Sequence, residues 1–579
     1  MFFKGKHKFA FLCFFACALP LSAAKWSSQK LIPANNWVYK ALVTLSKECK
    51  NTTITNQAPL TIAEARENLY ALPYDELSDS GKELYEKLES YFETEYFSTP
   101  WEVFSAGTTL FSSFETQGAT NAQTVNETWD YIHTYNNQKP IFQMPVYLSI
   151  FDFALIETEL LLQENYWSIN ESSNWTNIPV SFGSGYTDAD FYWPKTAYFS
   201  VGVPFKGVDF FNLHIGKTGL NIGSTRLDST ILDDDLETDV YAGFSLYSPR
   251  IRYEAEILQL EVNKYLYLHY INTRPTTWFS LGVTEGTLVN APFELRYLNP
   301  LMVMHSFAAW YSYKDYNNGQ DDGESETFMG GGESRISQHL GITMEVTPLK
   351  NWRIYLVYAQ NELQLPSELQ NDYGKSLSWS FGVQLGTDFS IPAFDNGYWH
   401  FGLEGLYSSP WNYMRFSRNT SFVRTRYDNM RNGSTPIYSW IGNQYGPDSI
   451  CAELYFGYEK VQKWSAELSY LFLAKGENDT SLFLEYDEEG YYYYPGSYWG
   501  HEGKKYSSAQ EAIDAAWLIS PTGTPEFTNR VLLKGSYTFT DRIQTDASLG
   551  YVVILNSDHS YGTVEHGLLF SISGTFKIF

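Results

Sequence analysis

The chain has 579 residues, of which 66 are acidic and 40 are Lys or Arg, so its formal net charge is −26. This charge repels nucleic acid and excludes it as a partner. Aromatic residues make up 17% of the chain, yet the mean hydropathy is −0.31, and beyond the N-terminus no run approaches the roughly 18 apolar residues of a spanning helix. Abundant but dispersed apolar residues favour alternating strands with aromatic girdles over membrane helices.

Residues 1–24 are predicted to be a secretory signal peptide, because three lysines precede an apolar run and the small residues Ser22-Ala23-Ala24 follow it. A lipobox ending at Cys17 is the alternative. Cleavage after residue 24 removes three lysines and no acids, which moves the net charge from −26 to about −29. It leaves Cys49 and Cys451. An oxidising compartment permits a disulfide, but we expect both to be unpaired because they fall in different predicted domains.

Residues 25–100 show helical periodicity. Val38, Leu42 and Leu45 share one helical face, and Thr61 with Glu64 forms the arrangement of a capping box, in which side chain and backbone satisfy each other reciprocally. A third helix is predicted within residues 78–97. We therefore predict a small N-terminal α-helical domain, on the periplasmic side of the membrane.

Residues 101–140 are rich in Thr, Asn and Ser and are poorly periodic, which predicts a linker or a segment that packs on the next domain. From residue 141 to residue 579, apolar and polar residues alternate with period two, as in residues 376–385, where Trp379 and Phe381 flank Ser380. Charged residues recur on the polar face.

A soluble β-sandwich would show the same alternation. Three features favour a membrane barrel instead: the apolar faces end in Trp or Tyr, the gaps alternate between short turns and long aromatic loops, and the chain is exported. About 440 residues at some 24 per strand and connection predict about 18 strands, an even number as in bacterial barrels. The fold class is therefore all-β, a transmembrane outer-membrane antiparallel β-barrel whose charged face lines the lumen and whose outer face contacts outer-membrane lipid.

The chain ends in an alternating segment, residues 567–579, that presents Leu568, Phe570 and Ile572 on one side. We predict that it closes the barrel by pairing with the first strand, which removes both sheet edges. The aromatic C-terminus is the kind of end that the barrel-assembly machinery recognises in proteins that this chain resembles.

No catalytic, cofactor or metal motif is present in the sequence. The histidines are scattered outside any HExxH or paired-Cys setting, and no G-x-S-x-G occurs. Residues 315–334 combine an acidic stretch with Met329-Gly-Gly-Gly, but they lack the lysine of a phosphate loop and the ordered spacing of a calcium loop. We therefore expect a protein that is not an enzyme and that uses no cofactor.

The candidate ligand-binding segment is residues 411–440, which is locally basic in an acidic chain. Arginine makes bidentate contacts to carboxylates and aromatic rings stack on sugars, so the pattern suits an acidic glycan. The alternative is that these arginines neutralise the lumenal acids Glu404, Glu453, Glu459 and Glu467. Residues 485–506, aromatic but acidic, are a second candidate for neutral sugars or for packing. The predicted ligand-binding residues are Trp411, Tyr413, Arg415, Arg418, Arg424, Arg426, Tyr427, Arg431 and Asp448.

Several stretches resemble, in order, the outer-membrane capsule-assembly proteins of the Wzi family. They are "FELRYLNPLMVMHSF" (293–307), "NWRIYLVYAQNEL" (351–363), "GLEGLYSSPWNYMR" (402–415) and "WIGNQYGPDSICAELYFGYE" (440–459). The N-terminal "IPANNWVYKALVTLSKE" and "APLTIAEARENL" look like the helical module that often precedes that barrel, itself similar to half of an S-layer-homology repeat. Gln360-Asn361-Glu362 departs from the paired acidic motif expected after "IYLVY".

The resemblance implies an 18-stranded outer-membrane barrel with a helical periplasmic module, acting as a lectin that holds capsular polysaccharide at the cell surface. Trp411 to Arg415 and Gly446 to Asp448 fall on family motifs. Two other functions stay open: a porin with an acidic lumen, and a structural barrel whose helical module binds peptidoglycan.

Overall fold

The computed structural model describes residues 22–25, 27–53, 56–93, 95–98, 104–125, 139–164, 176–178, 189–192, 194–202, 209–234, 236, 240–293, 336–362, 379–415, 418–430, 433–479, 510, 514 and 517–578. Most of the predicted signal peptide lies outside these residues, as does the lipobox at Cys17, so both stay predictions. Residues 315–334 and 485–506 lie outside them as well.

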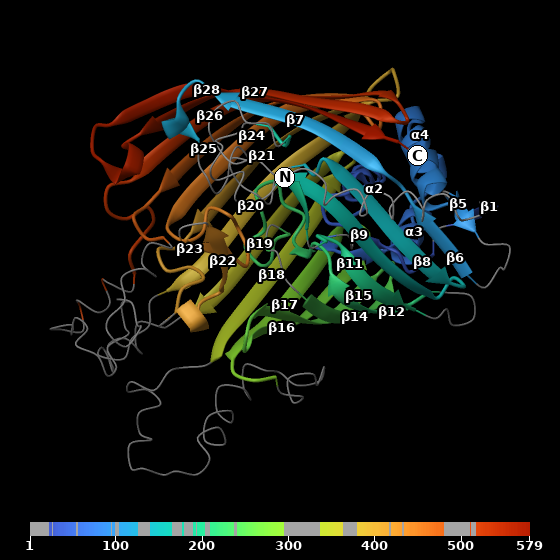
Figure 1. Ribbon diagram of the computed structural model, residues 1–579, viewed down its shortest axis with the longest axis horizontal. Helices are drawn as coiled ribbons and strands as arrows, with labels where there is room; N and C mark the ends of the chain where they lie inside the picture. The colour runs from blue at the N-terminus through green and yellow to red at the C-terminus, as the bar shows by residue number, and fades with distance from the viewer. Residues whose placement is uncertain are drawn as a thin grey trace, which may run out of the picture.

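The described strands form a closed antiparallel β-barrel of 18 strands, as predicted (Figure 1). Closure comes from the last strand, β28, which pairs with the first, β7, with Ile572 opposite Thr116. The strands of the wall are β7 (Phe111–Ala119), β8 (Phe142–Ile150), β9 (Ala154–Glu164), β11 (Ala197–Val201), β12 (Phe211–Lys217), β14 (Val240–Ser248), β15 (Ile251–Glu261), β16 (Lys264–Thr276), β17 (Phe279–Asn290), β18 (Ile336–Leu349), β19 (Trp352–Glu362), β20 (Ser380–Pro392), β21 (Tyr398–Ser408), β24 (Ser449–Lys460), β25 (Trp464–Lys475), β26 (Glu526–Thr540), β27 (Ile543–Leu555) and β28 (Val564–Lys577).

Shorter strands extend this wall. β6 (Phe104–Thr108) continues β7 along β8, and β10 (Ala189–Tyr192) continues β11 along β9. β5 (Glu95–Ser98) pairs with β1 (Ser22–Lys25) and with β6.

The boundary predicted at residue 141 is wrong, because residues 101–140 contain β6 and β7 and so provide the first strand of the barrel. The weak periodicity of this strand has a physical cause. Its outer face carries Gly118, and the ring of Phe570 on β28 lies where a Gly118 side chain would stand. The neighbouring strand therefore supplies the apolar surface that the sequence of β7 lacks.

The two faces of the wall have opposite character. Leu385, Leu403 and Leu454 point outward and are 58%, 50% and 55% exposed, whereas the inward Gln384 and Glu404 are fully buried. A soluble sandwich would bury the apolar face. The described wall turns its apolar face to its surroundings, as a membrane-spanning barrel does. The last strand follows the prediction, with Leu568, Phe570 and Ile572 outside.

The N-terminal region contains the three predicted helices, α2 (Trp37–Glu48), α3 (Ile62–Tyr70) and α4 (Asp79–Phe92), with the short strands β2 (Leu31–Ile32), β3 (Gln57–Ala58) and β4 (Leu60–Thr61). We call residues 27–93 the N-terminal module. No helix in the described part of the chain is both long and apolar enough to cross a membrane. Cys49 and Cys451 are buried and unpaired, as predicted.

Only half of the predicted capping box is present at the start of α3. The Thr61 hydroxyl accepts a hydrogen bond from the Glu64 backbone N–H at 3.1 Å, as predicted. The Glu64 carboxylate, however, does not turn back to Thr61, because it forms an ion pair of 2.8 Å with Arg252 of the barrel wall. A tertiary contact therefore replaces the local one.

The module sits at the end of the barrel where the strands are joined by short turns, and the C-terminus lies at the same end (Figure 1). The Thr52 N–H donates to the Thr277 carbonyl in one such turn, and the Ser80 hydroxyl donates to the Ala393 carbonyl in another. The Lys87 amine donates to the Val461 carbonyl in a third. The module is thus docked on the rim and does not hang free.

We expect Leu403→Arg to destabilise the barrel by about 2–4 kcal/mol, because it places a charge at the middle of β21 on the lipid-facing side. Denaturant titration of the protein folded into lipid vesicles measures this change, and Leu403→Phe is the matched apolar control. If Leu403→Arg were as stable as Leu403→Phe, the outer face would not contact lipid.

Candidate functional site

Chain that enters from both ends of the barrel occupies part of its inside. We call residues 218–234, which follow β12, the lumenal segment. Its short strand β13 (Asn221–Ile222) pairs with β3 of the N-terminal module, so that Asn221 lies opposite Ala58. Because the connection after β12 starts at the end opposite the short turns, this pairing joins the two ends of the barrel through its interior.

A second connection, residues 409–448 between β21 and β24, covers the lumenal segment, and we call it the cap segment. It contains the hairpin β22 (Val423–Met430) and β23 (Gly433–Trp440), which lies at the opposite end of the barrel from the helices (Figure 1). The lumenal and cap segments share one hydrophobic core with the inner faces of β14 to β17 and β19, so this part of the interior is packed like that of a soluble protein.

Tyr413 is at the centre of this core. It is fully buried, its hydroxyl donates to the Thr230 carbonyl at 2.9 Å, and the same oxygen accepts from the Asn443 N–H at 3.2 Å. Its ring stacks on Trp440 with the centroids 5.8 Å apart. Tyr413 therefore ties the cap segment to the lumenal segment. Trp411 is buried in the same core.

Asp448, also a predicted ligand-binding residue, is fully buried at the end of the cap segment. Its carboxylate accepts from the backbone N–H of Thr522 at 3.0 Å and from that of Asn478 at 3.2 Å. These bonds join the cap segment to both ends of the connection between β25 and β26, which gives Asp448 a structural role in the cap.

The structure describes the side chains of only some of the predicted arginines. Arg415 and Arg424 are buried in the cap segment, whereas Arg418 is half-buried. Arg426 and Tyr427 lie in β22, opposite Ile437 and Pro436, and their side chains are outside the described part of the chain, as is the whole of Arg431. Only Arg418, Arg426, Tyr427 and Arg431 therefore stay as candidates for contact with an external ligand.

The lumenal acids that we had considered as partners for these arginines are paired by other residues. Arg226 of the lumenal segment donates to Glu453 at 2.7 Å and forms an ion pair with Glu467, and its backbone N–H donates to Glu404 at 2.6 Å. Its guanidinium lies over the Tyr455 ring, 4.6 Å from the centroid. Glu459 pairs with Lys40 of α2.

One feature of the sequence points to this arrangement, although it belongs to no motif. Arg226 is the one basic residue of the acid-rich stretch 218–238. An arginine that lies inside a barrel needs carboxylate partners, but the partners of Arg226 follow about 180–240 residues later, so no spacing pattern links them.

The N-terminal module is held by a second buried network. The Lys47 amine of α2 forms an ion pair with Asp388, and the Arg353 guanidinium donates to the same carboxylate at 2.7 Å. Glu345 lies 3.5 Å from Arg353 and accepts from the Thr53 N–H at 3.1 Å. Burial lowers the pKa of Lys47, and the Asp388 carboxylate opposes that shift. Asp388 thus keeps two cations together in the interior.

No model of a protein family matches the chain, and no curated protein matches it. Solved structures, in contrast, do match the chain. One is described as Wzi, an outer membrane protein involved in group 1 capsule assembly in Escherichia coli and a carbohydrate binding β-barrel; it matches with a TM-score of 0.54 and 11% identity over 94% of this chain and 98% of Wzi. The fold is similar to that of Wzi.

Two further barrels match less well. The outer membrane channel DcaP of Acinetobacter baumannii has a TM-score of 0.33 and 8% identity over 83% of this chain and 99% of its own. OmpT, an outer membrane protein of Vibrio cholerae, has a TM-score of 0.32 and 8% identity over 82% of this chain and 98% of its own. At 11% identity, the likeness to Wzi concerns the fold. It confirms the Wzi-like barrel that the sequence predicts, whereas the S-layer-homology-like character of the N-terminal module stays a prediction.

We expect Asp388→Asn to release the N-terminal module from this Wzi-like barrel. The substitution leaves Lys47 and Arg353 buried without their shared carboxylate, which costs about 3 kcal/mol or more. Cys49 reports the release, because burial raises its pKa to about 12 and keeps the thiol unreactive near neutral pH. In a Cys451→Ala background, maleimide labelling of Cys49 should rise by about a hundredfold.

Lys350→Ala is the control for that experiment. It removes an exposed ion pair with Glu76 close to Cys49, and exposed pairs contribute about 0–1 kcal/mol. Equal labelling of Asp388→Asn and Lys350→Ala would show that the buried network does not hold the module in place.

Proposed function

We propose that this protein is a non-enzymatic outer-membrane protein that binds capsular or other surface polysaccharide and holds it at the cell surface. The observation that carries the proposal is the occupied interior: the lumenal segment and the cap segment enter the barrel and share one core with part of its wall. We infer that a barrel occupied in this way presents a surface rather than conducts solutes, which argues against the porin alternative.

The likeness to Wzi adds support, because that structure is described as a carbohydrate binding β-barrel from capsule assembly. The surface that we assign to the polysaccharide is the outer part of the cap segment, at the end of the barrel away from the helices. Arg418, Arg426 and Arg431 provide its positive charge, and Tyr427 provides a ring on which a sugar can stack. The proposed ligand class is an acidic polysaccharide, whose carboxylates guanidinium groups bind in a bidentate manner.

The buried members of the predicted site do not contact the ligand in this proposal; they hold the cap segment in place beneath the surface. Trp411, Tyr413 and Asp448 fix the cap segment, and the Lys264 amine of β16 donates to the carbonyls of Arg418 and Val423, at 3.0 Å to the first. Both carbonyls belong to the part of the cap that carries the proposed binding arginines. The cap is thereby pre-organised, which lowers the entropy cost of binding.

In this proposal, the module end of the barrel faces the periplasm, because short turns lie on the periplasmic side of outer-membrane barrels. The C-terminal strand then ends where the barrel-assembly machinery can bind it. A contact of the module with peptidoglycan is compatible with this orientation. Deletion of the module would not test that contact cleanly, because Thr53, Asn56 and β3 also contact the inner wall and the lumenal segment.

The triple variant Arg418→Ala, Arg426→Ala, Arg431→Ala should weaken binding of an acidic polysaccharide by at least about tenfold, because each lost charge-assisted contact contributes roughly 1.5–3 kcal/mol at best. Affinity electrophoresis of the full-length protein in gels containing alginate measures this loss, and dextran gels report binding of a neutral chain. Retention of the unsubstituted protein in alginate should fall as salt rises.

The matched control removes three positive charges from the short-turn end, where Arg250, Lys463 and Arg542 are exposed. Alanine at these three positions should leave alginate retention unchanged. If both triple variants lost retention equally, net charge and not the cap surface would govern binding; if neither did, the proposed surface would be wrong.

A further inference from the structure

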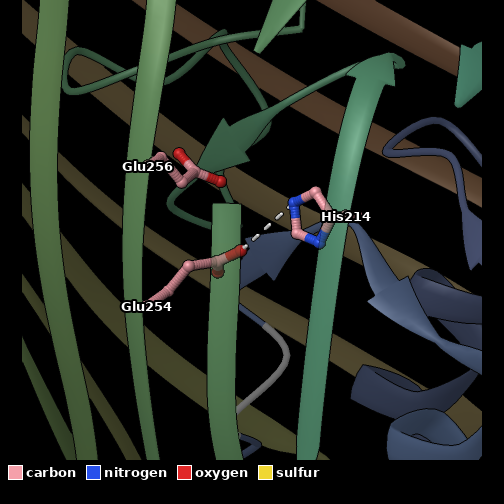
Figure 2. A group of neighbouring side chains, drawn as sticks. All are labelled: His214, Glu254 and Glu256. Carbon is pink, nitrogen blue, oxygen red and sulfur yellow. Dashed lines mark ion pairs between the residues drawn. The ribbon is translucent and has the colours of Figure 1, made fainter. Parts of the chain in front are cut away.

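Three inward-facing side chains at the middle of the barrel wall form a cluster that neither the fold nor the proposed function uses. His214 of β12 and Glu254 and Glu256 of β15 point toward one another, as Figure 2 shows, and one ligand atom from each lies within 4.8 Å of the others. Each residue is at most 3% exposed. An imidazole with two carboxylates is a donor set typical of divalent transition metals.

The strand register creates the space between these side chains. His214 lies opposite Gly243 of β14, and Gly243 in turn lies opposite Glu256. A Cβ atom at Gly243 would stand 2.7 Å from His214 Nε2 and 3.3 Å from Glu256 Cγ. Glycine on the middle strand therefore lets residues from two strands that are not neighbours reach each other across it.

A hydrogen bond fixes which ring nitrogen of His214 faces the carboxylates. The Asn212 amide nitrogen donates to the Gln29 side-chain oxygen at 2.9 Å and to the Val201 carbonyl at 3.4 Å, so the other end of this amide is its oxygen. That oxygen lies 2.8 Å from His214 Nδ1, which must then carry the proton. Nε2 is left with a lone pair aimed into the cluster.

This arrangement is the one that metal-binding histidines show, since they usually donate the other ring N–H to an oxygen. His214 Nε2 is buried and has no hydrogen-bond partner among the described residues. The nearest oxygen of Glu254 is 4.0 Å away, too far for a hydrogen bond. A lone pair facing carboxylate oxygens in a buried site is stabilised by a cation between them, or by a proton on one of the carboxylates.

The charges around the cluster do not balance. Arg252 lies 2.8 Å from both Glu64 and Glu254. Among the described residues it is the one guanidinium in an ion pair with these carboxylates, and Glu256 adds a third negative charge. No donor among the described residues reaches either oxygen of Glu256. Two negative charges are therefore uncompensated inside the barrel, which is costly unless a cation is bound or the carboxylates share protons.

We propose that His214, Glu254 and Glu256 bind one divalent transition-metal ion of the Zn²⁺ class. The ligand atoms around tetrahedral Zn²⁺ lie about 3.3 Å apart, given Zn–N and Zn–O distances of about 2.0–2.1 Å, so small side-chain rotations would complete the site. The imidazole ligand favours Zn²⁺ over Mg²⁺ and Ca²⁺, which prefer oxygen alone.

The ion would act as a structural clamp between the wall and the N-terminal module. The Gln57 amide of β3 donates to Glu254, and the Arg252 guanidinium donates to the Pro59 carbonyl at 2.9 Å. An ion that holds Glu254 therefore fixes the residues that dock β3 and the start of α3. Because the site is fully enclosed, we expect the ion to enter during folding.

The test uses the full-length protein refolded from urea into detergent with ZnCl2, then desalted against EDTA and analysed for zinc by mass spectrometry. We expect one zinc per chain, and CoCl2 in place of ZnCl2 should give the visible absorption bands of a four- or five-coordinate site. His214→Gln and Glu256→Gln should each lower zinc affinity by at least about tenfold. Glu159→Gln removes another buried lumenal carboxylate, which accepts from the Gln143 amide, and should retain zinc like the unsubstituted protein.

Absence of zinc from the refolded protein would overturn the proposal and would indicate that Glu254 and Glu256 share a proton instead. Equal zinc binding by His214→Gln, Glu256→Gln and the unsubstituted chain would also overturn it, as an adventitious ion only. If neither variant folds, as judged by heat-modifiable mobility in electrophoresis, zinc-edge absorption spectra of the unsubstituted protein decide. One imidazole ligand with oxygen ligands supports the site, and oxygen ligands alone contradict it.

Discussion

A wall that turns its apolar face to lipid has to place its charged residues on the inner side, where each of them needs a partner. In this chain the inner wall carries Glu404, Glu453, Asp388 and Arg353, all buried. Leaving such charges unpaired inside a barrel would be costly. The partners come from chain that folds into the lumen: Arg226 from the lumenal segment and Lys47 from the N-terminal module. Neutralisation of the inner face is therefore the constraint that fills the barrel.

The same constraint fixes the position of the proposed binding surface. The lumenal segment is held by acids of the wall, and through Tyr413 and Thr230 it holds the cap segment. Packed contacts therefore connect the rim that binds the helices with the basic outer part of the cap. Such a structure would keep the proposed binding surface rigid, because the cap segment is held by buried contacts.

The sequence predicted the architecture well because strand alternation is a local pattern. Phe381 to Leu385 on β20 is one example, and the outward leucines of the wall confirm it. Its failures also have physical causes. The sequence predicts a linker at β7, because the outer face of this strand is poor in apolar residues. Its apolar cover comes from Phe570 of β28, a strand that is adjacent in space but far away in the sequence.

The candidate site was predicted less well, because exposure is a tertiary property. Arginines spaced through a loop look alike in sequence, yet Arg415 and Arg424 are buried while Arg418 is half-buried. His214 and Glu256 come together only through the register of three strands, with Gly243 between them. Neither the burial of an arginine nor a cross-strand cluster leaves a spacing pattern that a single sequence can show.

The central claim is that the interior is closed, so that the barrel serves as a scaffold for a surface and not as a channel. Conductance of the full-length protein in planar lipid bilayers tests it most directly. A filled interior predicts insertion, shown by protease protection of the reconstituted barrel, with almost no ohmic current in potassium chloride. Stable, open current steps from the unsubstituted protein would contradict the account and would favour a porin.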